Sequence, residues 1–103
     1  MSRSDTIGSH KTAVYMDSDG TLCVKYHDTI VWQRKPDGTV ILDSGGWRTR
    51  TTSLRMNQAF RQYGYPYGVR QVKGEWFVYD HVTGRDVPYF DHMTVYSRNA
   101  AAA

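Results

Sequence analysis

Hydrophobic and polar positions along this chain follow two different periods. Runs that alternate at every second residue, the pattern of half-buried strands, occupy both ends of the sequence. A run near the middle instead places Met56, Ala59, Phe60 and Tyr63 at i, i+3, i+4 and i+7, on one face of a helix. The order of strands, one helix and strands is typical of an α+β domain.

The alternating runs predict short strands separated by turn sequences. Asp17-Ser18-Asp19-Gly20 and Lys35-Pro36-Asp37-Gly38 combine residues that favour tight turns, so each is expected to join two antiparallel strands. Glycines and prolines further along the chain indicate turns between the expected strands of the second half. The expected strands span residues 13–16, 21–26, 29–34, 39–42, 69–73, 75–79, 87–90 and 93–96.

The principal helix is expected near residues 53–63. Thr51 or Thr52 can serve as its N-cap, and Gly64 provides a residue that accepts a positive φ just after its end. A helix of this length is marginal alone and needs a sheet to pack on. Its polar side is expected to carry Arg55, Gln58, Arg61 and Gln62.

The predicted fold is therefore α+β, a curved antiparallel sheet with one principal helix, and a small open β-barrel is the alternative. Residues 1–12 are predicted to form a flexible arm, residues 13–98 a single domain and residues 99–103 an unstructured tail. The buried core is predicted to include Trp47, Phe60, Trp76 and Val78.

Composition excludes several classes of protein. Hydrophobic residues make up 40% and aromatic residues 14% of the chain, too much for a disordered protein. The single cysteine, Cys23, cannot form an internal disulfide and fits a reducing compartment. No apolar run approaches the length of a membrane span, so we expect a cytoplasmic protein with no membrane partner.

The charges are distributed unevenly along the chain. Residues 44–74 contain six basic and no acidic residues, whereas the remainder contains seven basic and ten acidic residues. Such asymmetry favours an anionic partner, and the alternative is a solvated basic face with no specific partner. The basic residues of this segment are Arg48, Arg50, Arg55, Arg61, Arg70 and Lys73.

The loop between the expected strand 39–42 and the helix is the most informative stretch. It has a glycine pair, two arginines and several threonines, but it lacks the Gly-Lys pair of a Walker loop. Backbone N–H groups at a helix start and guanidinium groups together suit a phosphate. The residues predicted to contact phosphate or nucleic acid are Gly45, Gly46, Arg48, Arg50, Thr51, Thr52, Arg55 and Arg61.

Tyr65 and Tyr67 follow the basic helix and are predicted as platforms on which bases stack. The alternative is that these tyrosines form a packed corner of the domain. The loop has a similar alternative, in which Gly45 and Gly46 form a bend anchored by Trp47 in the core. An anchored Trp47 would still leave the arginines directed outward.

Signatures of catalysis and metal binding are weak. Cys23 and His27 lack a third group to orient them as a nucleophilic pair, and Glu75 is the only glutamate. We therefore expect no catalytic residues, no metal and no cofactor. The histidines fall in separate turns without the spacing of a helical metal site: His10, His27, His81 and His92.

Two halves of the chain carry motifs that resemble small, uncharacterised proteins of tailed bacteriophages and related mobile elements. The resemblance covers about residues 21–95 and implies a phage accessory gene product that acts in the host cytoplasm. The first half contains Tyr26-His27-Asp28-Thr29-Ile30-Val31, Leu42-Asp43-Ser44-Gly45-Gly46-Trp47-Arg48-Thr49-Arg50-Thr51-Thr52 and Arg55-Met56-Asn57. The second half contains the run 69–79 followed by Asp86-Val87-Pro88-Tyr89-Phe90.

Accessory products of this size are commonly binders or inhibitors, which the resemblance implies here. The first functional hypothesis is a protein that binds nucleic acid or a nucleotide phosphate through the basic loop. The alternative is a protein-binding inhibitor of a host defence or host enzyme complex. A structural component of the virion is the third hypothesis.

Overall fold

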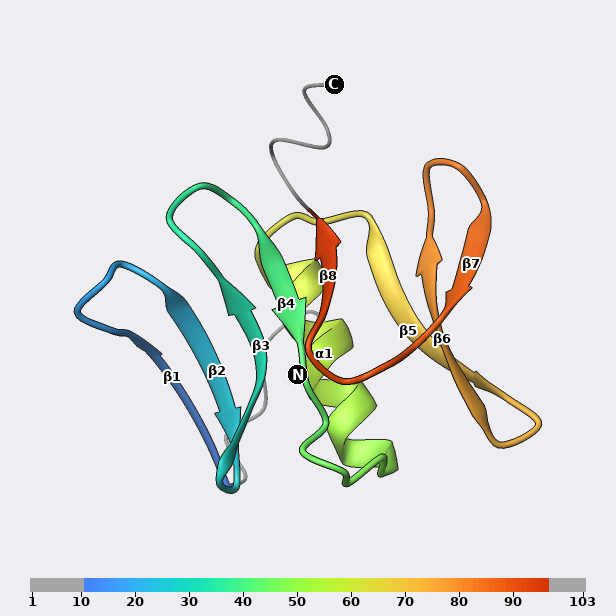
Figure 1. Ribbon diagram of the computed structural model, residues 1–103, viewed down its shortest axis with the longest axis horizontal. Coiled ribbons are helices and arrows are strands. Elements are labelled where there is room, and N and C mark those ends of the chain that lie inside the picture. The colour runs from blue at the N-terminus through green and yellow to red at the C-terminus, as the bar shows by residue number, and fades with distance from the viewer. Residues whose placement is uncertain (1–10, 97–103) are drawn as a thin grey trace, which may run out of the picture.

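The structure of the chain is a computed structural model that describes residues 11–96 (Figure 1). It contains one helix and two antiparallel sheets, so the predicted α+β fold is confirmed. The described strands form two separate sheets and no closed barrel, which agrees with the first prediction rather than with a small open barrel. The predicted arm, except for its last two residues, and the predicted tail lie outside the described residues.

The larger sheet has the strand order β1-β2-β3-β4-β8. Its last strand comes from the end of the chain, which returns beside β4 after building the second sheet. A register shift between Val24 and Lys25 bends β2 against β3. The strands of this sheet are β1 (Thr12–Met16), β2 (Leu22–Tyr26), β3 (Thr29–Arg34), β4 (Val40–Leu42) and β8 (Met93–Tyr96).

The smaller sheet has the strand order β5-β6-β7 and is built from two consecutive hairpins. Figure 1 shows the helix between the two sheets, and it contacts β2 and β3 on one side and β5 on the other. The remaining elements are α1 (Arg50–Gln62), β5 (Tyr67–Val72), β6 (Glu75–Asp80) and β7 (Arg85–Pro88).

Trp32 on β3 is the largest fully buried side chain in the described part of the chain. Its ring stacks on Tyr63 at 5.4 Å between centroids and meets the edge of Phe60 at 6.0 Å. The predicted burial of Phe60, Trp76 and Val78 is confirmed. Trp32, Phe60, Trp76 and Val78 belong to one hydrophobic core. Its other buried residues are Leu22, Val24, Val31, Val40, Leu42, Met56, Ala59, Val69, Tyr89 and Met93.

The expectation that Trp47 is buried is wrong, because 72% of this residue is exposed. The tryptophan that is fully buried between the larger sheet and the helix is Trp32. Trp47 lies two residues before the N-cap of the helix, on the outer side of the loop. Its ring is therefore accessible at the surface of the loop.

The helix begins earlier than expected. Thr49 is the N-cap, and its Oγ1 accepts a hydrogen bond from the Thr52 N–H at 3.2 Å, so the prediction of Thr51 or Thr52 as the cap is wrong. The end agrees with the prediction, because Gly64 has φ +78° and Tyr65 N–H donates to the Phe60 carbonyl at 2.9 Å.

Part of the predicted polar side of the helix is buried. The helix packs between two sheets, so a wider arc of its surface is covered than one sheet would cover. Arg55 and Gln58 are therefore buried, whereas Arg61 and Gln62 are exposed as expected.

Candidate nucleic-acid interface at the β4–α1 loop

The loop between β4 and α1 lies at the same end of the molecule as the β2–β3 turn (Figure 1). We refer to residues 43–49 as the β4–α1 loop. Asp43 N–H donates to the Val31 carbonyl at 3.2 Å, which continues the pairing with β3 for one residue beyond β4. From there the chain leaves the sheet and turns toward the helix start at Arg50.

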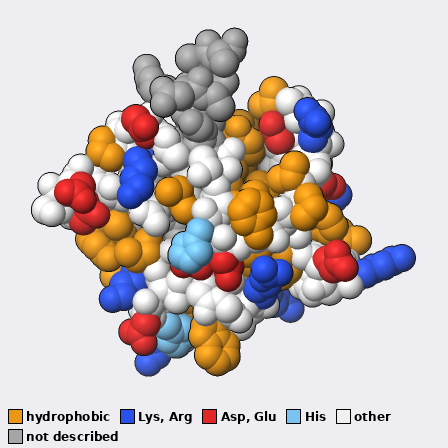
Figure 2. Space-filling view, viewed as in Figure 1, with side chains coloured by type: hydrophobic (Ala, Val, Ile, Leu, Met, Phe, Trp, Pro, Cys, Tyr) orange, Lys and Arg blue, Asp and Glu red, His pale blue; other side chains and the backbone are white. Residues whose placement is uncertain are grey.

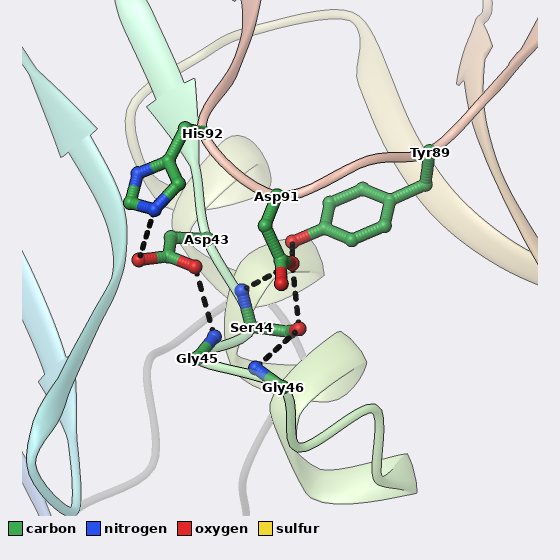
Figure 3. Close-up of polar contacts among 7 residues, drawn as sticks. All are labelled: Asp43, Ser44, Gly45, Gly46, Tyr89, Asp91 and His92. Carbon is green, nitrogen blue, oxygen red and sulfur yellow. Dashed lines mark hydrogen bonds and ion pairs between the residues drawn. The ribbon is translucent and has the colours of Figure 1, made fainter.

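A carboxylate from the β7–β8 connection holds the loop in place. Asp91 Oδ1 accepts hydrogen bonds from the Ser44 N–H at 3.1 Å, the Ser44 hydroxyl at 2.7 Å and the Tyr89 hydroxyl at 2.8 Å (Figure 3). Ser44 is almost fully buried. Segments 47 positions apart in the sequence therefore fix the geometry of the loop.

The N–H groups of Gly45, Gly46 and Trp47 also have acceptors within the protein. Gly45 N–H donates to Asp43 Oδ1 at 2.9 Å, and Gly46 N–H donates to the Ser44 hydroxyl at 3.2 Å (Figure 3). Trp47 N–H donates to the Ser44 carbonyl at 3.0 Å. An anion at this loop would therefore be held by side chains rather than by the N–H groups of the glycine pair.

The two glycines of the loop predict different mutational effects. Gly45 has φ +64° and lies against Thr29, whose Oγ1 would be 2.4 Å from an added Cβ; Gly46 has φ +85° but open space around it. Both alanine variants strain the backbone by about 1–2 kcal/mol. We expect Gly45→Ala to reduce the free energy of unfolding further than Gly46→Ala, as measured by denaturant titration. Equal losses in the two variants would contradict the close approach of the loop to Thr29.

The pKa of Asp91 reflects its place in this network. Burial alone would raise the pKa, but the hydrogen bonds from Ser44 and Tyr89 and the charge of Arg48 outweigh it and lower the pKa of Asp91 below its ordinary value. The pKa of Tyr89 is raised by burial and by its hydrogen bond to Asp91.

A pH prediction follows from the lowered pKa of Asp91. Its folded pKa lies below its unfolded value, so its stabilising contribution is present above the unfolded pKa, about 3.9, and is lost as the pH falls through the folded pKa. We expect Asp91→Asn to remove part of the acid-dependent loss of stability, as measured by thermal melts from neutral to acidic pH. Parallel pH profiles in the two proteins would contradict this role.

The side chains on the outer side of the loop are aromatic and basic. Trp47, Arg48 and Arg50 are all exposed. The guanidinium carbon of Arg48 lies 5.0 Å from the centroid of the Tyr89 ring, so a cation–π contact orients this side chain. Arg50 is the first residue of the helix, and no acidic residue occupies the first turn.

A pocket of about 390 Å³ lies between this loop, the β2–β3 turn and the start of the helix. Its walls combine aromatic rings with hydroxyl groups, a mixture suited to a planar polar ligand. The left-handed backbone of His27, with φ +56°, turns the β2–β3 connection at its rim. The lining residues are Tyr26, His27, Asp28, Thr29, Val31, Ser44, Trp47, Thr49 and Thr52.

Arg55 was predicted on the binding surface, but its side chain is only 6% exposed. Its Nε donates to Thr12 Oγ1 at 2.9 Å, and its Nη1 donates to Gln58 Oε1 at 3.1 Å. The guanidinium carbon also lies 5.7 Å from the centroid of the Tyr26 ring. Arg55 therefore ties the helix to β1 and β2.

The remaining predicted site residues are divided between the two ends of the helix. Thr51 and Thr52 lie in its first turn, with Thr52 buried at the pocket wall. Arg61 lies in the last turn of this 13-residue helix, which is about 20 Å long. Tyr65 and Tyr67 follow that end, and both rings pack against Phe60 in the core.

Figure 2 shows that basic side chains on the visible face are scattered among acidic ones rather than gathered in one patch. The basic segment of the sequence is thus divided in space, because the helix carries Arg61 away from the loop. The loop supplies the local grouping of Trp47, Arg48 and Arg50. Among residues 11–96 no group of three or more His, Cys, Asp and Glu side chains could hold a metal ion, and no helix is long and apolar enough to cross a membrane.

Sequence reasoning missed the residues that position the loop. Asp43 and Ser44 directly follow a strand, but nothing local indicates that Asp91 binds Ser44 from the opposite half of the chain. Tyr89 was read as part of a strand, whereas its hydroxyl completes the network. His92 was placed in a turn without a partner, whereas its Nε2 lies 3.6 Å from Asp43 Oδ2.

The fold and the loop define a small α+β domain that presents an exposed aromatic and basic loop. The family model of the Kyanoviridae Gp96 protein matches residues 1–96, and the chain belongs to this family of phage proteins. The expected phage origin is thereby confirmed. No curated protein and no solved structure matches the chain.

Proposed function

We propose that this phage protein binds single-stranded nucleic acid in the host cytoplasm through the β4–α1 loop. In this proposal a base stacks on Trp47, and the adjoining phosphates pair with Arg48 and Arg50. The observation that carries the proposal is the 72% exposure of Trp47 between a hydroxyl-lined pocket and two exposed arginines. Stacking on aromatic side chains beside basic groups is the common basis of single-strand binding.

The charge at the start of the helix supports the same proposal. The N-terminal end of a helix carries a partial positive charge, so an arginine there is unfavourable for stability. Arg50 nevertheless occupies the first helical position, and the first turn contains no acidic residue to balance it. A phosphate at this position would be attracted by both the arginine and the helix dipole.

The rigidity of the loop also favours binding. Asp91, Asp43 and Ser44 hold its backbone through hydrogen bonds before any ligand arrives. A loop that is ordered in advance loses less conformational entropy on binding. Trp47 offers a ring face, which an unpaired base can reach more readily than a base inside a duplex.

Fluorescence anisotropy with labelled single-stranded and double-stranded oligonucleotides tests the proposal. We expect the single strand to bind more tightly, and we expect Trp47→Ala to weaken its binding by about 1–3 kcal/mol through the loss of one stacked base. Trp47→Phe keeps an aromatic ring and should retain part of the affinity. Thermal melts of each variant provide the control for folding, and an exposed residue should change them little.

Two results would overturn the proposal: the absence of binding even at low salt, and equal affinities for wild-type protein and Trp47→Ala. Tryptophan and arginine are also the residues most enriched at protein-binding hot spots. Either result would therefore leave the protein-binding inhibitor as the next hypothesis for the same loop. Capture from a host lysate by wild-type protein but not by Trp47→Ala would then be the relevant comparison.

A further inference from the structure

We propose that two copies of this chain associate through their β1 strands, which pair antiparallel about a two-fold axis at Val14. The larger sheets of the two copies would then form one continuous sheet. This inference concerns a surface other than the β4–α1 loop and does not depend on the nucleic-acid proposal. It rests on a comparison of the four edge strands, on the direction in which the backbone groups of β1 point and on the charges at the two ends of β1.

Two of the four edge strands in the described residues, β5 and β7, are protected against pairing with another chain. On β5, the Asn57 side chain occupies both backbone groups of Val69, accepting from its N–H at 2.7 Å and donating to its carbonyl at 3.0 Å. On β7, Pro88 and the charged residues Arg85 and Asp86 discourage pairing. β8, the other edge of the larger sheet, faces side chains of β5, β6 and β7 across a groove of about 320 Å³, so the smaller sheet stands beside this edge.

β1 lacks the features that protect β5 and β7. It is the terminal strand of the larger sheet, and among the described strands it pairs only with β2. Its sequence, Thr-Ala-Val-Tyr-Met, contains no charge, proline or glycine. Val14, Tyr15 and Met16 are 43%, 39% and 57% exposed, although strands usually bury such residues. An uncharged, apolar edge strand is a template for pairing with another strand.

The hydrogen-bond alternation of β1 shows which of its backbone groups face away from β2. Lys11 carbonyl accepts from the His27 N–H at 2.8 Å, and Asp17 N–H donates to the Thr21 carbonyl at 2.9 Å, so the backbone groups of odd-numbered residues face β2. The backbone groups of Val14 and Met16 consequently face outward. A two-fold axis at Val14 allows each Val14 N–H to donate to the Val14 carbonyl of the other copy.

The charges at the ends of β1 fit the same register. Pairing about Val14 places Lys11 of one copy opposite Asp17 of the other, and the symmetry creates this pair twice. Lys11 and Asp17 are both exposed, and no charge lies between them on the strand. Lys11, with φ +52°, and Asp17 lie just outside β1 at its two ends, so the opposite charges would meet where the paired strands end. A register centred on Met16 instead places Asp17 opposite Tyr15.

Sedimentation velocity over a concentration series, with the full chain, tests the charge pairs. We expect wild-type protein to show a monomer–dimer equilibrium. The Lys11→Glu variant places a negative charge opposite Asp17 of the other copy at both symmetric positions of the dimer. The repulsion should raise the dimer Kd by about tenfold or more. Asp17→Asn keeps the side-chain oxygen that accepts from the Asp19 and Thr21 N–H groups in the turn. In the Asp17→Asn background, Lys11→Glu should therefore change the Kd much less.

A backbone variant tests the strand pairing itself. Val14→Pro removes an N–H that faces away from β2, so it should abolish the dimer while the monomer stays folded by circular dichroism. Asp19→Asn, a charge change in the same turn, should leave the Kd unchanged. Wild-type protein that remains monomeric at millimolar concentration would overturn the proposal. A dimer that is insensitive to Lys11→Glu, which leaves the strand backbone intact, would overturn it as well.

Discussion

Trp32→Ala is expected to lower the free energy of unfolding by about 3–5 kcal/mol, the loss typical of a large aromatic side chain in a core. Trp32 is fully buried and its ring contacts the rings of Tyr63, Phe60 and Tyr65, so alanine would leave a cavity where the helix meets the larger sheet. Denaturant titration followed by circular dichroism measures the loss. If the variant does not fold, Trp32→Phe provides a measurable intermediate.

The matched control is the same change at an exposed tryptophan. Trp47→Ala should alter the free energy of unfolding by no more than about 0.5 kcal/mol, because the side chain lies on the surface. Trp32→Phe should cost less than Trp32→Ala, because it keeps a ring and removes an indole N–H that has no hydrogen-bond partner among the described residues. A loss of similar size for Trp32→Ala and Trp47→Ala would contradict the assignment of the core.

Arg48→Ala combined with Arg50→Ala is expected to weaken single-strand binding strongly and to change its salt dependence. Each phosphate contact releases condensed counterions, at about 0.7 per phosphate for a single strand, so the loss of two contacts should make the slope of log K against log salt shallower by about 1.4. Lysine cannot form the bidentate hydrogen bonds that arginine forms with a phosphate. Arg48→Lys combined with Arg50→Lys should therefore retain only part of the wild-type affinity. Anisotropy titrations over a salt series measure both quantities.

The matched control removes the same charge from elsewhere on the protein. Arg61 lies in the last turn of α1, and Lys73 lies in the β5–β6 turn; both are exposed. Arg61→Ala with Lys73→Ala therefore reproduces the change in net charge without touching the loop. Equal losses of affinity in the two double variants would indicate a diffuse attraction by net charge and would contradict direct contacts at Arg48 and Arg50.

The strands and the helix could be predicted because local patterns determine them. β3 and β8 have the predicted bounds, and the stripe of Met56, Ala59 and Phe60 is buried as its spacing indicates. The start of the helix was misplaced because Thr49, Thr51 and Thr52 lie close together and each of these threonines can act as N-cap; the hydrogen bond of Thr49 decides among them. The division of the strands between two sheets could not be predicted, because it depends on the pairing of β8 with β4. These strands are distant in the sequence, and no local pattern indicates their pairing.

The site was only partly predictable for a similar reason. Arg48 and Arg50 were identified from charge alone, and the structure places both on the exposed side of the loop. Hydrophobicity suggested that Trp47 is buried, because a sequence does not show that Trp32 already fills the core. The attachment of the loop to Asp91 is a contact over 47 positions, and such contacts follow from the tertiary fold rather than from spacing.

The fluorescence of Trp47 gives the most direct test of the central claim, that bases stack on this side chain. Trp32 and Trp76 are buried, so the emission that acrylamide quenches readily should come from Trp47. Titration with a short single-stranded oligonucleotide should quench that emission and protect it from acrylamide, and Trp47→Phe should lose both effects. Binding detected by anisotropy without any change in Trp47 emission or in its access to acrylamide would contradict the account.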